Sequence, residues 1–163
     1  MSYTNLPLSQ TVAIRSVASP DHYIGLDATC VTQFTAAGAG QVKTPTYVGT
    51  HETFLLQQND DNTVSFKSTV FNNVYIRLDG SNLPKDTGIP SGGGEVNGQY
   101  TADIWEKFHI HKKGDEFHQY KAVVGIESAA FPGRYLRMDA HNGIVNVQGV
   151  FESLEEFEIL VIG

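Results

Sequence analysis

Hydrophobic and polar residues alternate along three stretches of the chain that align with one another without a gap. They read VAIRSVASPDHYIGLDA (12–28), VSFKSTVFNNVYIRLDG (64–80) and VGIESAAFPGRYLRMDA (124–140). In each stretch a serine precedes a tyrosine by seven residues, and the tyrosine precedes an aspartate by four. A second element follows each stretch and has the frame Glu-x-Phe-x-Ile/Leu. This self-similarity predicts three copies of one supersecondary unit.

Each copy is predicted to form strands, because its apolar and polar positions alternate and many of its residues are β-branched or aromatic. The Tyr-containing segment at the end of each stretch is predicted to bury one face. Its opposite, exposed face would carry the tyrosine, arginine and aspartate. The positions predicted to be buried are Ile24, Leu26, Ile76, Leu78, Leu136 and Met138.

The Glu-x-Phe-x-Ile/Leu segments predict a further strand in each copy, with Phe54, Phe108 and Phe157 pointing inward. A weaker strand is expected before them, at 31–36 in the first copy and at 143–148 in the third. Four strands in three copies make twelve. This number and the threefold pattern predict an all-β fold, the β-trefoil, in which three hairpins close a six-stranded barrel.

The length of 163 residues is typical of one domain that buries a substantial core. We therefore expect a single β-trefoil domain over 1–163, with repeats at about 10–60, 61–115 and 116–163.

The spacers after the first and second copies are longer than the spacer after the third. In the second copy the extra length lies in 83–103, which includes the Ser-Gly-Gly-Gly run at 91–94. Insertions of this kind cost little when the scaffold is rigid, and loops on rigid scaffolds often carry binding sites. Residues 91–94 are expected to form a flexible surface loop without a binding role. The alternative is that they form a binding loop.

The repeats resemble three families of trefoil proteins. The pattern Ser-x-x-x-Pro-x-x-Tyr-Leu-x-x-Asp, followed by Glu-x-Phe-x-Ile, resembles the repeats of fascin-type actin cross-linkers. SVASPDHYIGLDA and ESAAFPGRYLRMDA are similar to the repeats of arabinofuranose-binding carbohydrate modules. Residues 127–136 are also similar to the signature of interleukin-type cytokines. The resemblance implies a trefoil over essentially the whole chain, and it does not choose among these functions.

The chain departs from these families at their functional residues. Leu26, Leu78 and Met138 stand where arabinofuranose-binding modules have a histidine, and the Glu of the Glu-x-Phe frame replaces an Asp. The Gln-x-Trp repeat of ricin-type lectins is absent. The acidic composition also differs from the basic surface through which fascin-type proteins usually contact actin.

The chain has 11 basic and 18 acidic residues, a formal net charge of −7. Nucleic-acid binding relies on basic patches, so neither a nucleic acid nor an anionic membrane surface is an expected partner. No apolar run is long enough for membrane insertion, no signal-peptide pattern is visible, and there is one cysteine. A cytoplasmic location is therefore expected, with export that needs no signal peptide as the alternative. The oligomeric state is not indicated.

Asp27, Asp79 and Asp139 recur at matching positions, and two hypotheses account for them. Carboxylates accept hydrogen bonds from sugar hydroxyls, so three equivalent shallow pockets would make a trivalent binder. Alternatively, each aspartate caps the turn that follows it.

Further candidates for ligand binding come from matching arginines and from aromatic residues near the spacers. The second and third copies have Arg77 and Arg137 where the first has Gly25. These arginines are expected to pair with nearby carboxylates or with the glutamates of the last strand. Aromatic rings stack on the C–H faces of sugars. The aromatic candidates are Tyr47, Tyr100 and Trp105.

The sequence has no pattern that indicates catalysis, such as a nucleophile elbow or a phosphate-binding loop. His109 and His111 share a strand face, but no third ligand at a fixed spacing accompanies them, so neither a metal site nor a cofactor is expected. We therefore expect a non-enzymatic, lectin-like carbohydrate-binding module. The alternative is a protein-binding trefoil, either actin-associated like fascin or similar to a cytokine or protease inhibitor, that uses 83–103.

Overall fold

The computed structural model describes residues 5–35 and 37–162 of the chain, which form twelve strands and three short 3-10 helices in these ranges. The first copy contains β1 (Thr11–Ser16), β2 (Gly25–Asp27), β3 (Gln41–Lys43), η1 (Thr50–Glu52) and β4 (Phe54–Gln58). The second contains β5 (Val64–Ser68), β6 (Val74–Asp79), β7 (Glu95–Tyr100), η2 (Ile104–Glu106) and β8 (Phe108–His118). The third contains β9 (Lys121–Ser128), β10 (Tyr135–Asp139), β11 (Ile144–Gln148), η3 (Ser153–Glu155) and β12 (Phe157–Val161).

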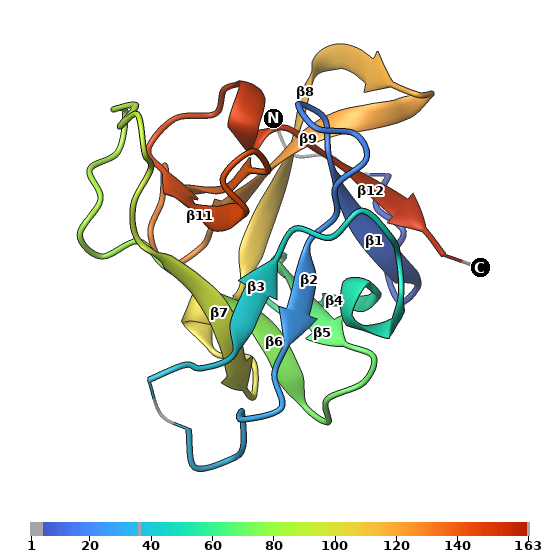
Figure 1. The fold of residues 1–163 in the computed structure, drawn as a ribbon, viewed down its shortest axis with the longest axis vertical. Helices are drawn as coiled ribbons and strands as arrows, with labels where there is room; N and C mark the ends of the chain where they lie inside the picture. Colours follow the sequence, from blue (N-terminus) through green and yellow to red (C-terminus); the bar gives the residue numbers. More distant parts are fainter. Residues whose placement is uncertain (1–4, 36, 163) are drawn as a thin grey trace.

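Six of the strands close into an antiparallel barrel. The pairs are β1–β4, β4–β5, β5–β8, β8–β9, β9–β12 and β12–β1, so each barrel strand has a neighbour on both sides. The remaining strands form one antiparallel pair in each copy, β2–β3, β6–β7 and β10–β11 (Figure 1). A closed six-stranded barrel with three hairpin pairs is a β-trefoil, and the predicted fold class is confirmed.

The core contains the residues that the alternation predicted. Phe54, Phe108 and Phe157 have no exposed surface, and neither do Phe66 and Ile14. The six apolar positions predicted in the Tyr-containing segments, which lie on β6 and β10 and on or next to β2, are also fully buried or nearly so. Each buried side chain of this size contributes about 1.5–3 kcal/mol to folding, so the repeated apolar positions supply much of the driving force.

The repeated serines have a structural role. The hydroxyls of Ser16, Ser68 and Ser128 accept a hydrogen bond from the backbone N–H three residues later, at 3.0, 2.9 and 3.0 Å. This bond fixes the start of the turn that leads to the tyrosine strand. The serine that recurs in all three copies therefore shapes the turn.

The strand predicted at 31–36 is wrong, as far as residues 31–35 show; residue 36 lies outside the described residues. The third strand of the first copy is instead β3, ten residues later. Val31 sits in a turn with its side chain buried, and the ring of Phe34 is 84% exposed. The apolar residues in this segment therefore do not alternate on a pleated surface, which is what the strand prediction assumed.

The segment 83–103 contains strand β7 and is attached to the third copy. Gly93 forms a β-bridge with Val147, with backbone hydrogen bonds of 2.9 and 2.8 Å. Gly94 has a φ of +65°, and a Cβ there would lie 2.5 Å from the carbonyl oxygen of Asp79. The expectation that 91–94 is a flexible surface loop is therefore wrong, because these glycines allow a close approach between backbones.

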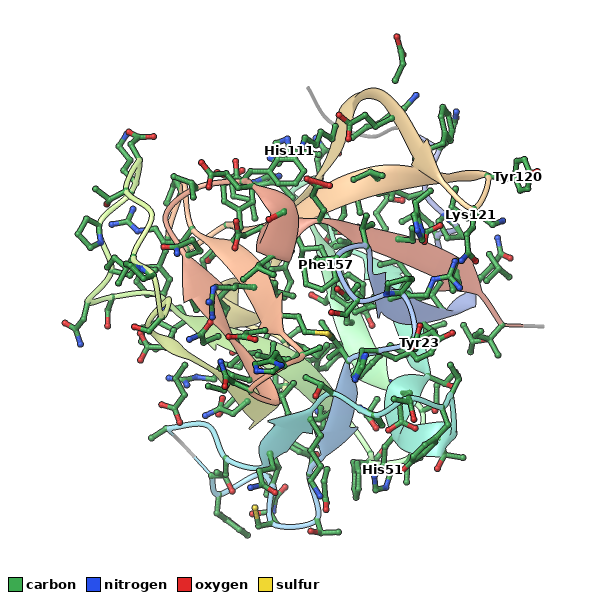
Figure 2. The ribbon with its side chains drawn as sticks, turned by 45° about the horizontal axis from the view of Figure 1, so that its top comes forward. Tyr23, His51, His111, Tyr120, Lys121 and Phe157 are labelled. Carbon is green, nitrogen blue, oxygen red and sulfur yellow. The ribbon has the colours of Figure 1, made fainter. Side chains whose placement is uncertain are left out.

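Strands β8 and β9 continue beyond the barrel as a two-stranded ribbon whose tip carries Tyr120 (Figure 2). Gln119 and Tyr120 form the two-residue turn, with φ values of 45° and 70°. The tyrosine is 97% exposed and nearby Phe117 is 59% exposed. Among the described residues, no helix is long and apolar enough to cross a membrane.

We expect the double substitution Gln119→Asn and Tyr120→Gly to stabilise the protein. Two-residue hairpin turns with positive φ at both positions favour Asn-Gly, and a bulky residue there is strained. The free energy of unfolding should rise by roughly 1 kcal/mol in urea denaturation followed by circular dichroism. A decrease would show that the Tyr120 ring makes stabilising contacts that outweigh the strain.

Candidate functional site

Each copy has a buried glutamate at the end of its 3-10 helix, just before the Phe strand. These residues are Glu52, Glu106 and Glu155. Their carboxylates accept hydrogen bonds from the backbone N–H groups of Gly49, Asp103 and Glu152, at 2.8, 2.8 and 2.9 Å. Such a bond satisfies an N–H group that the short helix leaves without a partner. The repeated glutamate therefore holds each 3-10 turn over the barrel and places the following phenylalanine in the core.

Beneath the first of these glutamates the chain has Gly25, and the structure explains why the arginine is missing there. A Cβ at Gly25 would lie 2.5 Å from Oε2 of Glu52. The carboxylate therefore occupies the space that a side chain would need, and the first copy has no room for an arginine at this position.

Arg137 in the third copy clamps the loop of the second copy. Its guanidinium donates to the carbonyl oxygens of Pro90 and Ser91, at 3.1 and 3.2 Å, and to Oδ1 of Asn146 at 3.1 Å. The distance to the Asp139 carboxylate is 3.8 Å. Arg137 also lines a cavity of about 270 Å³ between η3 and this loop. Its donors are largely used to join two copies.

Arg77 in the second copy has different surroundings. Its guanidinium lies 4.6 Å from the ring centroid of Trp105, a cation–π contact, and donates to Oδ1 of Asn97 at 3.3 Å. The Asp79 carboxylate lies 3.9 Å away. The prediction that Arg77 and Arg137 lie on an exposed face is wrong, because loops from the preceding copy cover both. The expected pairing with nearby carboxylates is confirmed.

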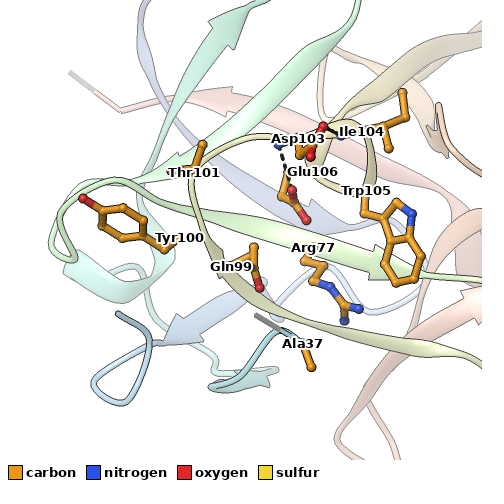
Figure 3. A pocket seen from close by; sticks show the side chains of 9 residues that line it. All are labelled: Ala37, Arg77, Gln99, Tyr100, Thr101, Asp103, Ile104, Trp105 and Glu106. Carbon is orange, nitrogen blue, oxygen red and sulfur yellow. Dashed lines mark hydrogen bonds between the residues drawn. The ribbon is translucent and has the colours of Figure 1, made fainter. Parts of the chain in front are cut away.

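A cavity of about 500 Å³ opens beside Arg77, and we call it the Arg77 cavity. Figure 3 shows Tyr100 and Trp105 at opposite ends, with Gln99 and Arg77 between them. It is lined by Ala37, Arg77, Gln99, Tyr100, Trp105 and Asp103, among others. Strand β6 supplies the arginine, β7 and its end supply Gln99 and Tyr100, and η2 supplies Trp105.

The walls of the Arg77 cavity are held by neighbouring copies. The ring of Trp105 packs edge-on against Phe131 of the third copy, with centroids 5.1 Å apart. The amide nitrogen of Gln99 donates to the carbonyl of Thr35 in the first copy, at 2.8 Å. The amide oxygen of Gln99 is buried and has no hydrogen-bond partner in the part of the chain that the structure describes.

Two carboxylates line the Arg77 cavity, and their environments differ. Asp103 is exposed at the rim, where its Oδ1 accepts the N–H of Ile104 at 2.9 Å. Glu106 is buried, and burial raises the pKa of its carboxyl group, although the Asp103 N–H and the Arg77 charge act in the opposite direction.

The three repeated aspartates act as turn caps, as one of the two hypotheses predicted. Oδ1 of Asp27, Asp79 and Asp139 accepts the backbone N–H of Thr29, Ser81 and Asn142, at 3.3, 3.1 and 3.2 Å. Hydrogen bonds from Thr29 and Asn142 lower the pKa of Asp27 and Asp139. None of the three lines the Arg77 cavity.

The structure brings together three of the predicted ligand-binding residues, Arg77, Tyr100 and Trp105. Arg137 lines the smaller cavity instead, and Tyr47 lies near η1 with 66% of its surface exposed. The copies therefore do not form three equivalent cavities. Sequence reasoning missed Gln99 and Asp103, whose place in the cavity depends on the pairing of β7 and on the η2 turn.

His109 and His111 do not gather further metal ligands around them. His111 Nε2 lies 2.6 Å from Oε1 of Glu127, whose other oxygen accepts the Gly133 N–H at 2.7 Å. Within residues 5–35 and 37–162, no group of three or more His, Cys, Asp or Glu side chains could hold a metal ion.

Comparisons with known proteins establish similarity of fold. No protein-family model and no curated protein matches the chain. A mosquitocidal holotoxin matches with a TM-score of 0.74 and 11% identity, over 98% of this chain and 18% of the toxin chain. A Culex quiquefasciatus salivary protein of the Cysteine and Tryptophan-Rich family matches with a TM-score of 0.70 and 12% identity, over 99% of both chains. SeviL bound to asialo-GM1 saccharide matches with a TM-score of 0.68 and 6% identity, over 94% and 98%.

The environment of Glu106 predicts a pH dependence of stability that Glu106→Gln should remove. Because the folded pKa is raised above the ordinary value near 4.5, the proton stabilises the folded state below that value, and this stabilisation is lost as the pH rises through the folded pKa. Glutamine stays neutral and can still accept the Asp103 N–H. As the pH rises from 4.5 to neutral, the urea midpoint of the natural protein should therefore fall relative to the midpoint of Glu106→Gln. The exposed Glu116→Gln is the control; an equal shift in both variants would refute the assignment.

Proposed function

We propose that the protein binds a carbohydrate in the Arg77 cavity and does not convert it chemically. The observation that carries the proposal is the combination of one aromatic ring, Trp105, with the polar groups of Gln99 and Asp103 around one hollow. Sugars present apolar C–H faces to aromatic rings and hydroxyl groups to hydrogen-bonding side chains. The volume of about 500 Å³ lies within the range of ligand cavities.

The cavity is also preorganised for a ligand. Trp105 is held between the Arg77 guanidinium and Phe131, and the Gln99 amide is oriented by the Thr35 carbonyl. Little ordering of these groups is then needed when a ligand binds, which reduces the entropic cost of binding. SeviL, which shares the fold, was determined with a saccharide bound; this supports the proposal by analogy only.

Two carboxylates in one cavity raise the question of sugar hydrolysis. The equivalents of Glu106 in the other copies, Glu52 and Glu155, hold their turns through the same backbone hydrogen bond. Because the glutamate at this position has the same structural role in all three copies, its presence is explained without a catalytic role. We therefore propose binding rather than hydrolysis.

Trp105→Leu tests the proposal, because the equivalent residue in the third copy is Leu154 and a turn of this type accommodates leucine. Glycan-array hits of the natural protein should bind the variant roughly tenfold more weakly by calorimetry, since the stacking surface is lost. Tyr47→Leu, an exposed aromatic outside the cavity, should bind as the natural protein does. Unchanged affinity in a folded Trp105→Leu variant would exclude this cavity.

A second candidate function, protein binding, rests on the tip of the β8–β9 hairpin. Phe117 and Tyr120 are exposed there, Lys112 Nζ lies 5.0 Å from the Phe117 ring centroid, and Tyr120 has a strained backbone. Exposed aromatic patches and strained residues both occur at interaction sites. We propose this surface, rather than 83–103, for an actin-associated, cytokine-like or inhibitor-like contact, because 83–103 is tied to the third copy.

Actin cosedimentation and a protease-inhibition panel test this second candidate. If either assay is positive, Phe117→Ser with Tyr120→Ser should abolish the effect, whereas Tyr47→Ser, which also removes an exposed aromatic, should retain it. An effect that survives in the hairpin variant would place the contact elsewhere on the surface.

A further inference from the structure

Two of the polar groups that line the Arg77 cavity, the Gln99 amide oxygen and the Asp103 carboxylate, are hydrogen-bond acceptors. The buried amide oxygen of Gln99 has no partner among the described residues, while the amide nitrogen is engaged by Thr35. A buried acceptor without a partner is unfavourable, and a ligand that donates a hydrogen bond removes this cost. At the rim, the exposed Asp103 carboxylate uses Oδ1 for the turn and is also an acceptor. Both groups favour a ligand that brings donors.

The charges that line the cavity point the same way. Arg77 is its one cationic lining residue among those described, whereas Asp103 and Glu106 are both acidic. The Arg77 charge is further balanced by Asp79, at 3.9 Å. The whole chain carries a formal net charge of −7, so the long-range field also repels anions. A carboxylated or sulfated ligand would therefore meet like charges.

From this lining we infer that the cavity selects neutral or amino saccharides, which donate hydroxyl or amine hydrogens, and rejects sugars that carry carboxylate or sulfate groups. The inference rests on the proposed carbohydrate-binding function and adds the chemical class of the ligand. Two features discriminate between neutral and acidic ligands. The unpaired Gln99 amide oxygen binds a ligand that donates a hydrogen bond, and the carboxylates of Asp103 and Glu106 repel an anionic ligand.

Matched pairs of glycans test the selectivity. An array should contain neutral oligosaccharides, their amino-sugar analogues, and the same backbones with a uronic acid or a sulfate group. We expect the neutral or amino member of a pair to bind roughly tenfold more tightly than the acidic member at low salt. The ratio should decrease as salt is added, because salt screens the repulsion at the exposed rim.

Two variants assign the selectivity to the lining. Asp103→Asn keeps an acceptor for the Ile104 N–H and removes the negative charge at the rim. The ratio of the affinities for the neutral and the acidic member of a pair should therefore decrease at least about threefold. Gln99→Met keeps the approximate side-chain length and removes the acceptor. A deoxy analogue, from which the donating hydroxyl has been removed, should bind the natural protein more weakly than the parent ligand does. Gln99→Met should bind the analogue and the parent ligand equally well. A merely structural role of Gln99 does not produce this difference.

The outcomes separate the two proposals. If acidic glycans bind as tightly as their neutral partners, or more tightly, the inferred selectivity is wrong while carbohydrate binding stands. If selectivity is present but unaffected by Asp103→Asn and Gln99→Met, it does not come from this lining and the inference is also wrong. If no glycan binds to protein shown to be folded by circular dichroism, both proposals are overturned.

Discussion

The structure depends on one repeated interaction, the hydrogen bond between a buried glutamate and the backbone N–H at the start of each 3-10 turn. Glu52, Glu106 and Glu155 are almost completely buried, and a buried carboxylate is tolerated only when it is hydrogen-bonded. Each glutamate lies two residues before the phenylalanine that begins the following barrel strand and fills the barrel. The same bond therefore joins the core to the segments that surround the cavities, and a loss of it would affect both.

This interaction also explains why the three copies differ in what they can bind. In the first copy, the Glu52 carboxylate lies where a side chain at position 25 would stand. In the third, Arg137 is engaged with the carbonyls of Pro90 and Ser91 and holds a loop in place. In the second, Arg77 lies against Trp105 beside a larger hollow. The residues that the copies share build the barrel, and the residues that distinguish them shape the candidate site.

Much of the fold could be predicted, because its signals are local and threefold. Strands with a clear period of two, such as those that bury Ile76 and Leu78, lie where expected. The strand predicted at 31–36 was wrong because Val31 is buried within a turn. An apolar residue at this position therefore does not indicate a strand. The glycine run at 91–94 predicts a flexible segment, because such runs usually are flexible. Here the absence of side chains allows the backbone of Gly93 to pair with Val147.

The sequence by itself determined the three copies, the buried face of each strand and the phenylalanines of the core, because these follow from periodicity over a few residues. It also identified Arg77, Tyr100 and Trp105 as candidates. Only the tertiary structure decided that these three share a cavity with Gln99 and that Tyr47 lies elsewhere. The physical reason is distance along the chain: the contact between Gln99 and Thr35 spans 64 residues. Such contacts form only when the barrel closes and brings the copies together, and no local pattern encodes them.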